Sequence, residues 1–209
     1  MFDITSFSLF VAASWALIIA PGPDMIYVIT RGVSQGRKAG LLSAMGVTLG
    51  IFVHTVAAAF GLAVLLRTSA LAFLIVKYAG GVYLIYLGLK ALKDKSGFAL
   101  IEQGKPMDLR SIFWQGALSN ILNPKVALFF LAFLPQFVNQ HNGYVTLQML
   151  GLGLIFALFG VAFLSVLGFF SGGIGGWLVQ RASIAGILRW LTGAILIGLG
   201  LRLAFVQRR

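Results

Sequence analysis

The apolar positions of the chain fall into six long runs separated by short polar stretches. A transmembrane helix needs about 20 mainly apolar residues, and each run has about that length or more. The runs cover 6–30, 40–66, 71–92, 111–138, 144–170 and 184–206. The pattern therefore predicts an all-α polytopic membrane protein with six transmembrane helices. The main hydrophilic stretch, 93–110, is expected to be a loop that joins two halves.

Two of the runs, the first and the fourth, contain residues that oppose a continuous lipid-facing helix. The interruptions are Pro21, Gly22 and Pro23 in the first run and Pro124 in the fourth. A proline removes a backbone donor and breaks or kinks a helix. Freed backbone groups at membrane depth are tolerated only where protein covers them or where they line a cavity. Paired breaks in corresponding segments indicate the binding site of a transporter.

The two halves of the chain resemble each other weakly. Placing Pro23 over Pro124 aligns three runs in about 1–92 with three runs in about 111–209. Because each half crosses the membrane an odd number of times, the halves must face opposite ways in the bilayer. The sequence therefore predicts one transporter domain over 1–209, built as two inverted three-helix repeats with broken first and fourth helices.

Composition and charge agree with a membrane protein and narrow its partners. The 209 residues are 59% apolar and only 10% charged, whereas a soluble domain carries about 25% charged residues. The net charge of +11 lies mostly in short segments between apolar runs, which is the distribution of membrane topology signals. We therefore expect the lipid bilayer, and no nucleic acid, as a partner. The chain has no cysteine, which excludes thiol catalysis.

The distribution of Lys and Arg predicts the orientation of the chain. Cytoplasmic connections carry an excess of these residues. Ten of them lie in or beside the connections after the first, third and fifth runs, and four lie on the opposite side. The four are Arg67, Arg202, Arg208 and Arg209. Both termini are therefore predicted to be periplasmic.

Asp24 and Lys125 are the charged candidates at the breaks. Asp24 is the only acidic residue in an apolar run, and an intramembrane carboxylate is by default a functional hypothesis because it is costly to place there. Its alternative role is to cap the half-helix that follows Pro23. Lys125 follows Pro124 and is expected either to bind a substrate carboxylate or Asp24, or to snorkel to the interface. We expect the two charges to face one cavity and to pair directly without substrate.

Uncharged polar residues complete the set of candidates. His54 in the second run is expected to relay protons or, as the alternative, to serve as a hydrogen-bonded packing residue. The fourth run adds the amides Gln115, Asn120, Asn123 and Gln136. These amides are expected either to bind the amino and carboxyl groups of a zwitterion or to bond between helices.

These residues together resemble the LysE/RhtB family of amino-acid exporters. The resemblance rests on Pro21-Gly22-Pro23, the glycines at 36, 40, 46 and 50, the Asn123-Pro124-Lys125 triplet and the 134–137 run Leu-Pro-Gln-Phe. It covers nearly the whole chain. It implies export of amino acids or related metabolites across the bacterial inner membrane, driven by the proton gradient. The position after the first motif varies in that family between an amide and a carboxylate, so the resemblance does not assign a proton to Asp24.

The expected function is secondary-active export of an amino acid by proton antiport with alternating access. Substrate and protons are the expected partners, no cofactor is expected, and a homodimer is compatible with the sequence. Two other classes remain open at this point. One is a passive channel, or a structural subunit that carries the breaks only for packing. The other is an intramembrane enzyme that would use Asp24 and His54 without a nucleophile or a metal cluster beside them.

Overall fold

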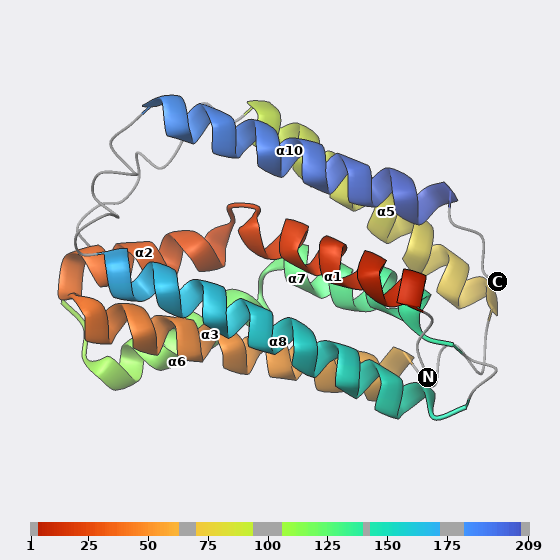
Figure 1. Ribbon diagram of the computed structural model, residues 1–209, viewed down its shortest axis with the longest axis horizontal. Helices are drawn as coiled ribbons and strands as arrows, with labels where there is room; N and C mark the ends of the chain where they lie inside the picture. The colour runs from red at the N-terminus through yellow and green to blue at the C-terminus, as the bar shows by residue number, and fades with distance from the viewer. Residues whose placement is uncertain (1–3, 63–69, 94–105, 140–142, 172–181, 206–209) are drawn as a thin grey trace.

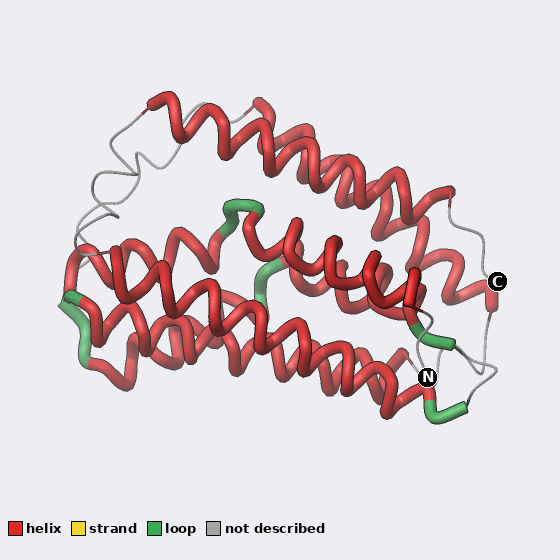
Figure 2. The backbone as a smooth tube through the Cα atoms, in the orientation of Figure 1, coloured by secondary structure: helices red, strands yellow, loops and turns green. Residues whose placement is uncertain are grey.

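Helices account for most of the chain, as Figures 1 and 2 show. The computed structural model describes residues 4–62, 70–93, 106–139, 143–171 and 182–205, and no strand occurs in those ranges. The first half contains α1 (Ile4–Ile19), α2 (Pro23–Gln35), α3 (Arg37–Ala57), the π-helical turn η1 (Ala58–Leu62) and α5 (Ala70–Lys93). The second half contains α6 (Leu109–Ile121), α7 (Pro124–Leu128), the turns η2 (Phe129–Phe133) and η3 (Leu134–Phe137), α8 (Val145–Phe170) and α10 (Ala182–Phe205). The all-helical prediction is confirmed.

Within the described residues, three helical segments are long and apolar enough to cross a bilayer. They are Arg37–Gly61, Leu74–Lys93 and Val145–Phe170. Two bent pairs raise the number to five if each counts as one span: Ile4–Ile19 with Pro23–Gln35, and Leu109–Ile121 with Pro124–Phe137. The sixth expected run forms α10, a helix of 24 residues that is not in this set. The structure thus supports three to five spans, and the arrangement of six spans in inverted repeats stays a prediction.

The two predicted breaks are present and bend the chain by similar angles. The axis turns by 50° between α1 and α2 and by 47° between α6 and the segment from Pro124 to Phe137. Each second half-helix starts at a proline, Pro23 or Pro124, because that position needs no intrahelical donor. Both breaks lie near the middle of the bundle, where Figure 2 draws them as short loops.

The helices form two groups that meet around α1 and α7. α5 and α10 lie side by side along one edge of the bundle (Figure 1). Their backbones approach closely because small residues line the contact: a Cβ on Gly200 would lie 2.6 Å from the carbonyl oxygen of Gly81. In the other group α3 packs against α6, α8 and α2. The site described below lies where the breaks of α1–α2 and α6–α7 face α3 and α8.

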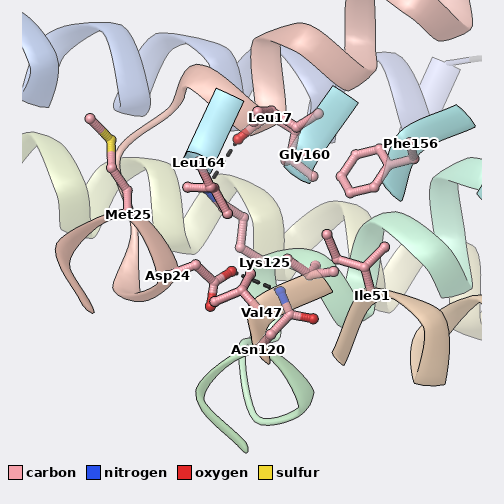
Figure 3. Close-up of a pocket in the computed structure, with 12 residues that line it drawn as sticks. Leu17, Asp24, Met25, Val47, Ile51, Asn120, Lys125, Phe156, Gly160 and Leu164 are labelled. Carbon is pink, nitrogen blue, oxygen red and sulfur yellow. Dashed lines mark hydrogen bonds between the residues drawn. The ribbon is translucent and has the colours of Figure 1, made fainter. Parts of the chain in front are cut away.

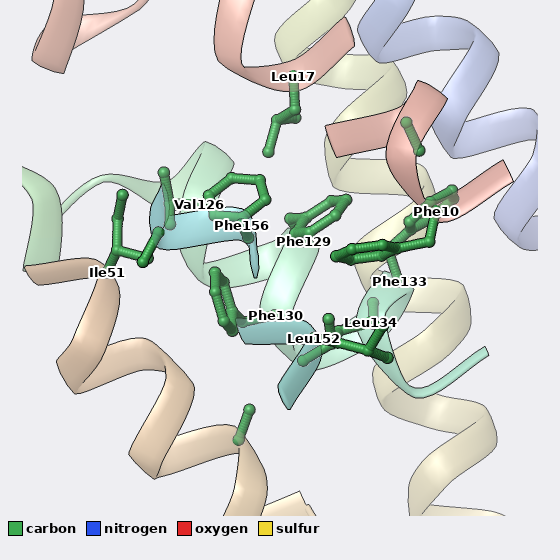
Figure 4. Close-up of a cluster of buried hydrophobic side chains, with 14 of the residues drawn as sticks. Phe10, Leu17, Ile51, Val126, Phe129, Phe130, Phe133, Leu134, Leu152 and Phe156 are labelled. Carbon is green, nitrogen blue, oxygen red and sulfur yellow. The ribbon is translucent and has the colours of Figure 1, made fainter. Parts of the chain in front are cut away.

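A cluster of phenylalanines fills the bundle on one side of the breaks (Figure 4). Phe129 stacks on Phe156 with ring centroids 4.9 Å apart, and Phe10 meets Phe137 edge-on at 5.5 Å. These rings are almost fully buried. The cluster joins α1, α8 and the η2–η3 segment, so it fixes the second break from one side.

The hydrophilic stretch 93–110 is described only in part, since residues 94–105 lie outside the described ranges. Its last part starts α6. Asp108 caps the helix by accepting 2.9 Å and 2.6 Å hydrogen bonds from the backbone N–H and the hydroxyl of Ser111. These bonds favour the ionised carboxylate, and they hold the pKa of Asp108 below its ordinary value.

Candidate functional site

The first break leaves two carbonyl oxygens at the end of α1 without helical donors. In a continuous helix Leu17 O would accept from residue 21, but Pro21 has no N–H. Lys125 donates instead: its Nζ lies 3.0 Å from Leu17 O and 2.7 Å from Ala20 O. The C-terminal end of a helix favours a cation. The buried ammonium of Lys125 therefore caps α1 from the second half of the chain, and it does not snorkel to the interface.

Gly22 makes room for this ammonium. Its backbone is extended, with φ −166° and ψ −178°, which any residue can adopt. A Cβ on Gly22, however, would lie 3.0 Å from Lys125 Nζ and 3.3 Å from Lys125 Cε. Steric access for Lys125, and not backbone freedom, accounts for a glycine between the two prolines.

The second break holds the carboxylate of Asp24. Asn123 is the N-cap of α7 and accepts a 3.0 Å hydrogen bond on Oδ1 from the backbone N–H of Lys125. Its Nδ2 is thereby turned to Asp24 and donates a 2.7 Å bond to Oδ2, while Asn120 Nδ2 donates a 2.9 Å bond to the same oxygen. The N-cap of α2 is Gly22, and no side chain caps that helix. Asp24 therefore makes no capping hydrogen bond, although it stands in the first turn of α2, where the helix dipole favours a negative charge.

Two acceptor oxygens at this site have no donor. Asp24 Oδ1 and Asn120 Oδ1 are both buried, and neither has a hydrogen-bond partner in the part of the chain that the structure describes. Buried polar atoms are rarely left in this state, and an unpartnered carboxylate oxygen is especially costly. A cationic donor or a proton would satisfy Asp24 Oδ1, whereas Asn120 Oδ1 faces α3, where a Cβ on Gly50 would lie 2.6 Å from it.

Asp24, Asn120 and Lys125 line one cavity (Figure 3). The space within it that the centre of a water molecule can occupy is about 30 Å³, which is room for a water or two in this state. These three residues supply the polar part of the lining. The rest is apolar: Leu17, Ile18, Met25, Val47, Ile51, Val126, Phe156, Gly160 and Leu164. The chemistry of this lining suits a small molecule with a charged end and an apolar end, for which the cavity would have to widen.

Asp24 and Lys125 line this cavity together without a direct ion pair. Asp24 accepts from two amides and Lys125 donates to two carbonyl oxygens, and the structure contains no contact between their charged atoms within 4.0 Å. The expectation of a direct pair is wrong because Pro21 creates carbonyl acceptors that bind the ammonium first. Both charges therefore remain in the cavity, each held by uncharged groups.

His54 lies next to this network but outside the lining of the cavity. Its Nε2 is 3.1 Å from the backbone oxygen of Asn120, and its ring stacks on Phe130 with centroids 5.9 Å apart. Because a carbonyl oxygen only accepts, Nε2 carries the proton. This geometry matches the packing interpretation of His54, and it leaves no direct contact with Asp24.

Two of the four candidate amides lie elsewhere. Gln115 accepts a 3.0 Å hydrogen bond from Arg31 Nη2 near the end of α2. Gln136 donates 3.1 Å to the carbonyl oxygen of Ala132 within its own segment. Neither lines the cavity. The structure thus brings together Asp24, Lys125 and the two asparagines, and it separates the two glutamines from them.

The apolar lining was not identified from the sequence. Phe156, Gly160 and Leu164 stand four residues apart on α8, and Val47 and Ile51 stand four apart on α3, so each set forms one helical face. Small-residue spacing in long apolar runs does predict close helix contact. It does not indicate which position opens onto a cavity.

The sequence of the chain is similar to those of known bacterial membrane proteins. The LysE type translocator family matches residues 15–207. The uncharacterized membrane protein YrhP of Bacillus subtilis (strain 168) is 34% identical over 195 residues, covering 89% of this chain and 92% of that protein. The uncharacterized membrane protein PA4757 of Pseudomonas aeruginosa is 32% identical, covering 96% of this chain and 95% of that protein. The leucine efflux protein of Salmonella typhimurium is 29% identical, covering 91% of each. No solved structure matches the chain significantly.

Proposed function

The chain belongs to the LysE type translocator family, and we propose that it exports an α-amino acid with an aliphatic side chain in exchange for protons. The leucine efflux proteins among its relatives and the mainly aliphatic walls of the cavity support this substrate class. The observation that carries the proposal is that one cavity with these walls is lined both by a carboxylate with an unpartnered oxygen, Asp24, and by an ammonium, Lys125.

The amino group of the substrate binds at Asp24. An ammonium has three donors, and the buried oxygen Asp24 Oδ1 lacks one. Hydrogen bonds between charged groups are the stronger ones. The amides that hold Asp24 Oδ2 also orient its other oxygen, so the carboxylate is positioned before the substrate arrives.

The carboxylate of the substrate binds at Lys125. Two of the three N–H groups of the ammonium are used by Leu17 O and Ala20 O, which leaves one for the substrate. The carbonyl oxygens hold Nζ in place while it binds. A zwitterion is thus recognised at both ends by charges that come from the two different halves of the chain.

Asp24 couples export to protons. Its carboxylate binds the substrate ammonium when ionised and loses that attraction when it takes up a proton. A proton from the periplasm therefore displaces the amino acid outwards. When the empty site faces the cytoplasm, Asp24 releases the proton there and can bind the next substrate molecule. One proton enters as one zwitterion leaves, which is antiport.

Alternating access requires a closed end, and a polar cluster joins the two halves at one end of the bundle. Arg31 donates to Gln115, and Gln35 donates 2.7 Å to the carbonyl oxygen of Met107. These contacts lie beside the α2–α3 turn, which carries Arg37 and Lys38. By the positive-inside rule this is the cytoplasmic end, so the cavity is closed towards the cytoplasm in this state. Both termini are then periplasmic, and the membrane is the bacterial inner membrane.

The two rival classes have less support. A channel does not need a site with matched charges at its centre. An enzyme using Asp24 and His54 would need both at the substrate, whereas His54 bonds to a backbone oxygen outside the cavity.

Purified protein in vesicles loaded with labelled leucine tests the proposal. We expect saturable efflux that accelerates when the outside is acidified. A non-saturating flux without dependence on the proton gradient would identify a channel, and conversion of leucine to a product would identify an enzyme.

A further inference from the structure

The contact between α3 and α8 is tight at both ends and open in the middle. At one end Gly40 meets Gly168, where a Cβ on Gly168 would lie 2.6 Å from the carbonyl oxygen of Gly40. At the other end Gly153 packs directly against the side chain of Thr55. Larger residues at these positions would push the helices apart. The glycines at both ends are therefore explained by helix packing.

Gly160 lies between these contacts and is not explained in the same way. A Cβ on Gly160 would meet only one atom within 4 Å, Cδ1 of Ile51, at 3.0 Å. No backbone approaches it. In a helix interior glycine is less favourable than alanine by about 1 kcal/mol, and a Cβ here would press on a single side-chain methyl, which would have to move by a few tenths of an ångström. Because Gly160 and Ile51 both line the cavity, that movement would narrow it.

The neighbours of Gly160 define what this part of the cavity receives. Phe156 and Leu164 stand one helical turn on either side of it, and Ile51 faces it from α3. In the view of Figure 3, Asp24 and Asn120 lie on one side of Lys125 and Gly160 and Phe156 on the other. A zwitterion bound by its charged groups would direct its side chain towards this apolar wall.

We propose that Gly160 sets the length of the side chain that the transporter accepts. The assignment rests on the proposed function and adds a residue that determines specificity. A methyl group at position 160 would occupy the space that the end of a leucine side chain needs and would leave room for the shorter side chain of alanine. One methylene in an apolar pocket changes selectivity about 10- to 200-fold.

The test compares efflux of leucine and alanine from vesicles containing the wild type, Gly160→Ala or Gly151→Ala. Gly151 lies on the same helix, and a Cβ there meets nothing within 4 Å, so it is the matched control. We expect Gly160→Ala to lower the ratio of leucine to alanine efflux about tenfold or more, with the ratio unchanged in Gly151→Ala. An unchanged ratio in an active Gly160→Ala protein overturns the assignment while leaving the proposed function intact. If the wild type exports no amino acid, the proposed function fails first.

A second variant covers the case in which Gly160→Ala does not fold. Ile51→Ala removes the atom that faces Gly160 and enlarges the same space. We expect it to raise efflux of phenylalanine relative to leucine. If Gly160→Ala is inactive and Ile51→Ala keeps the wild-type ratio, the wall between α3 and α8 does not contact the substrate side chain and the assignment is overturned.

Discussion

The Nδ2 atom of Asn123 lies 2.7 Å from Oδ2 of Asp24 and joins the two helix breaks. The same amide caps α7 through its oxygen, so one side chain both starts the second half-helix and holds the carboxylate of the first. The two breaks are therefore a single structural unit, and a change at one is expected to affect the other.

The ammonium of Lys125 is expected to stabilise the fold as well as to bind substrate. Lys125→Met removes the donor for Leu17 O and Ala20 O. A buried group left without its partner costs about 1 to 3 kcal/mol. We expect a lower melting temperature in detergent and weaker substrate binding. A variant as stable as the wild type would show that the carbonyl oxygens do not need this donor.

Gly22 is expected to contribute to stability only by leaving room for the side chain of Lys125. Gly22→Ala places a methyl 3.0 Å from Nζ and should lower the melting temperature, whereas the same change in a Lys125→Ala protein should have little effect. Residues in contact show coupling energies of about 0.5 to 3 kcal/mol in such cycles. Gly151→Ala, at an open position, is the control. Additive effects would mean that Gly22 is required for another reason.

Asp108 is expected to make a pH-dependent contribution to stability. Hydrogen bonds from Ser111 lower its folded pKa, so its contribution is complete above the unfolded pKa of about 3.9 and is lost as the pH falls through the folded value. Asp108→Ala should melt below the wild type at pH 7. The difference should shrink at acidic pH, as thermal scans across pH can measure. A difference independent of pH would assign the effect to something other than the charged cap.

The orientation can be tested because the chain has no native cysteine. Cysteine is introduced at Lys38, near the α2–α3 turn, or at Tyr144, before α8, and both positions are exposed. We expect an impermeant thiol reagent added to intact cells to label Tyr144→Cys and not Lys38→Cys. The reverse pattern would place the termini in the cytoplasm.

Some parts of this structure follow from the sequence and others do not. The breaks at Pro21–Pro23 and at Pro124 follow from local chemistry, since proline acts on its own helix whatever the fold. Asp24, Lys125, Asn120 and Asn123 were recognised as candidates because polar residues in apolar runs are costly.

The partners of these residues depend on how distant helices meet. Gln115 and Gln136 are amides like Asn120, but only Asn120 faces Asp24. Lys125 was expected to pair with Asp24, whereas it binds oxygens that Pro21 leaves free. The spacing of residues within a helix predicts which of them share a face, but it does not predict which other helix that face contacts. The contact between Gly160 and Ile51 therefore could not be predicted from the sequence.

Gradient-driven efflux by Asp24→Asn tests the central claim most directly. The amide can still accept hydrogen bonds from Asn120 and Asn123, so the variant should fold and remain in the membrane, but it cannot carry a proton. Hydrogen bonds involving a charged group contribute about 1.5 to 3 kcal/mol, which corresponds to roughly a 10- to 150-fold loss of binding. In vesicles loaded with labelled leucine and acidified outside, we predict rapid efflux with inward proton movement for the wild type and neither for Asp24→Asn at equal protein content. Efflux by Asp24→Asn at the wild-type rate, still accelerated by the acid gradient, would contradict the account.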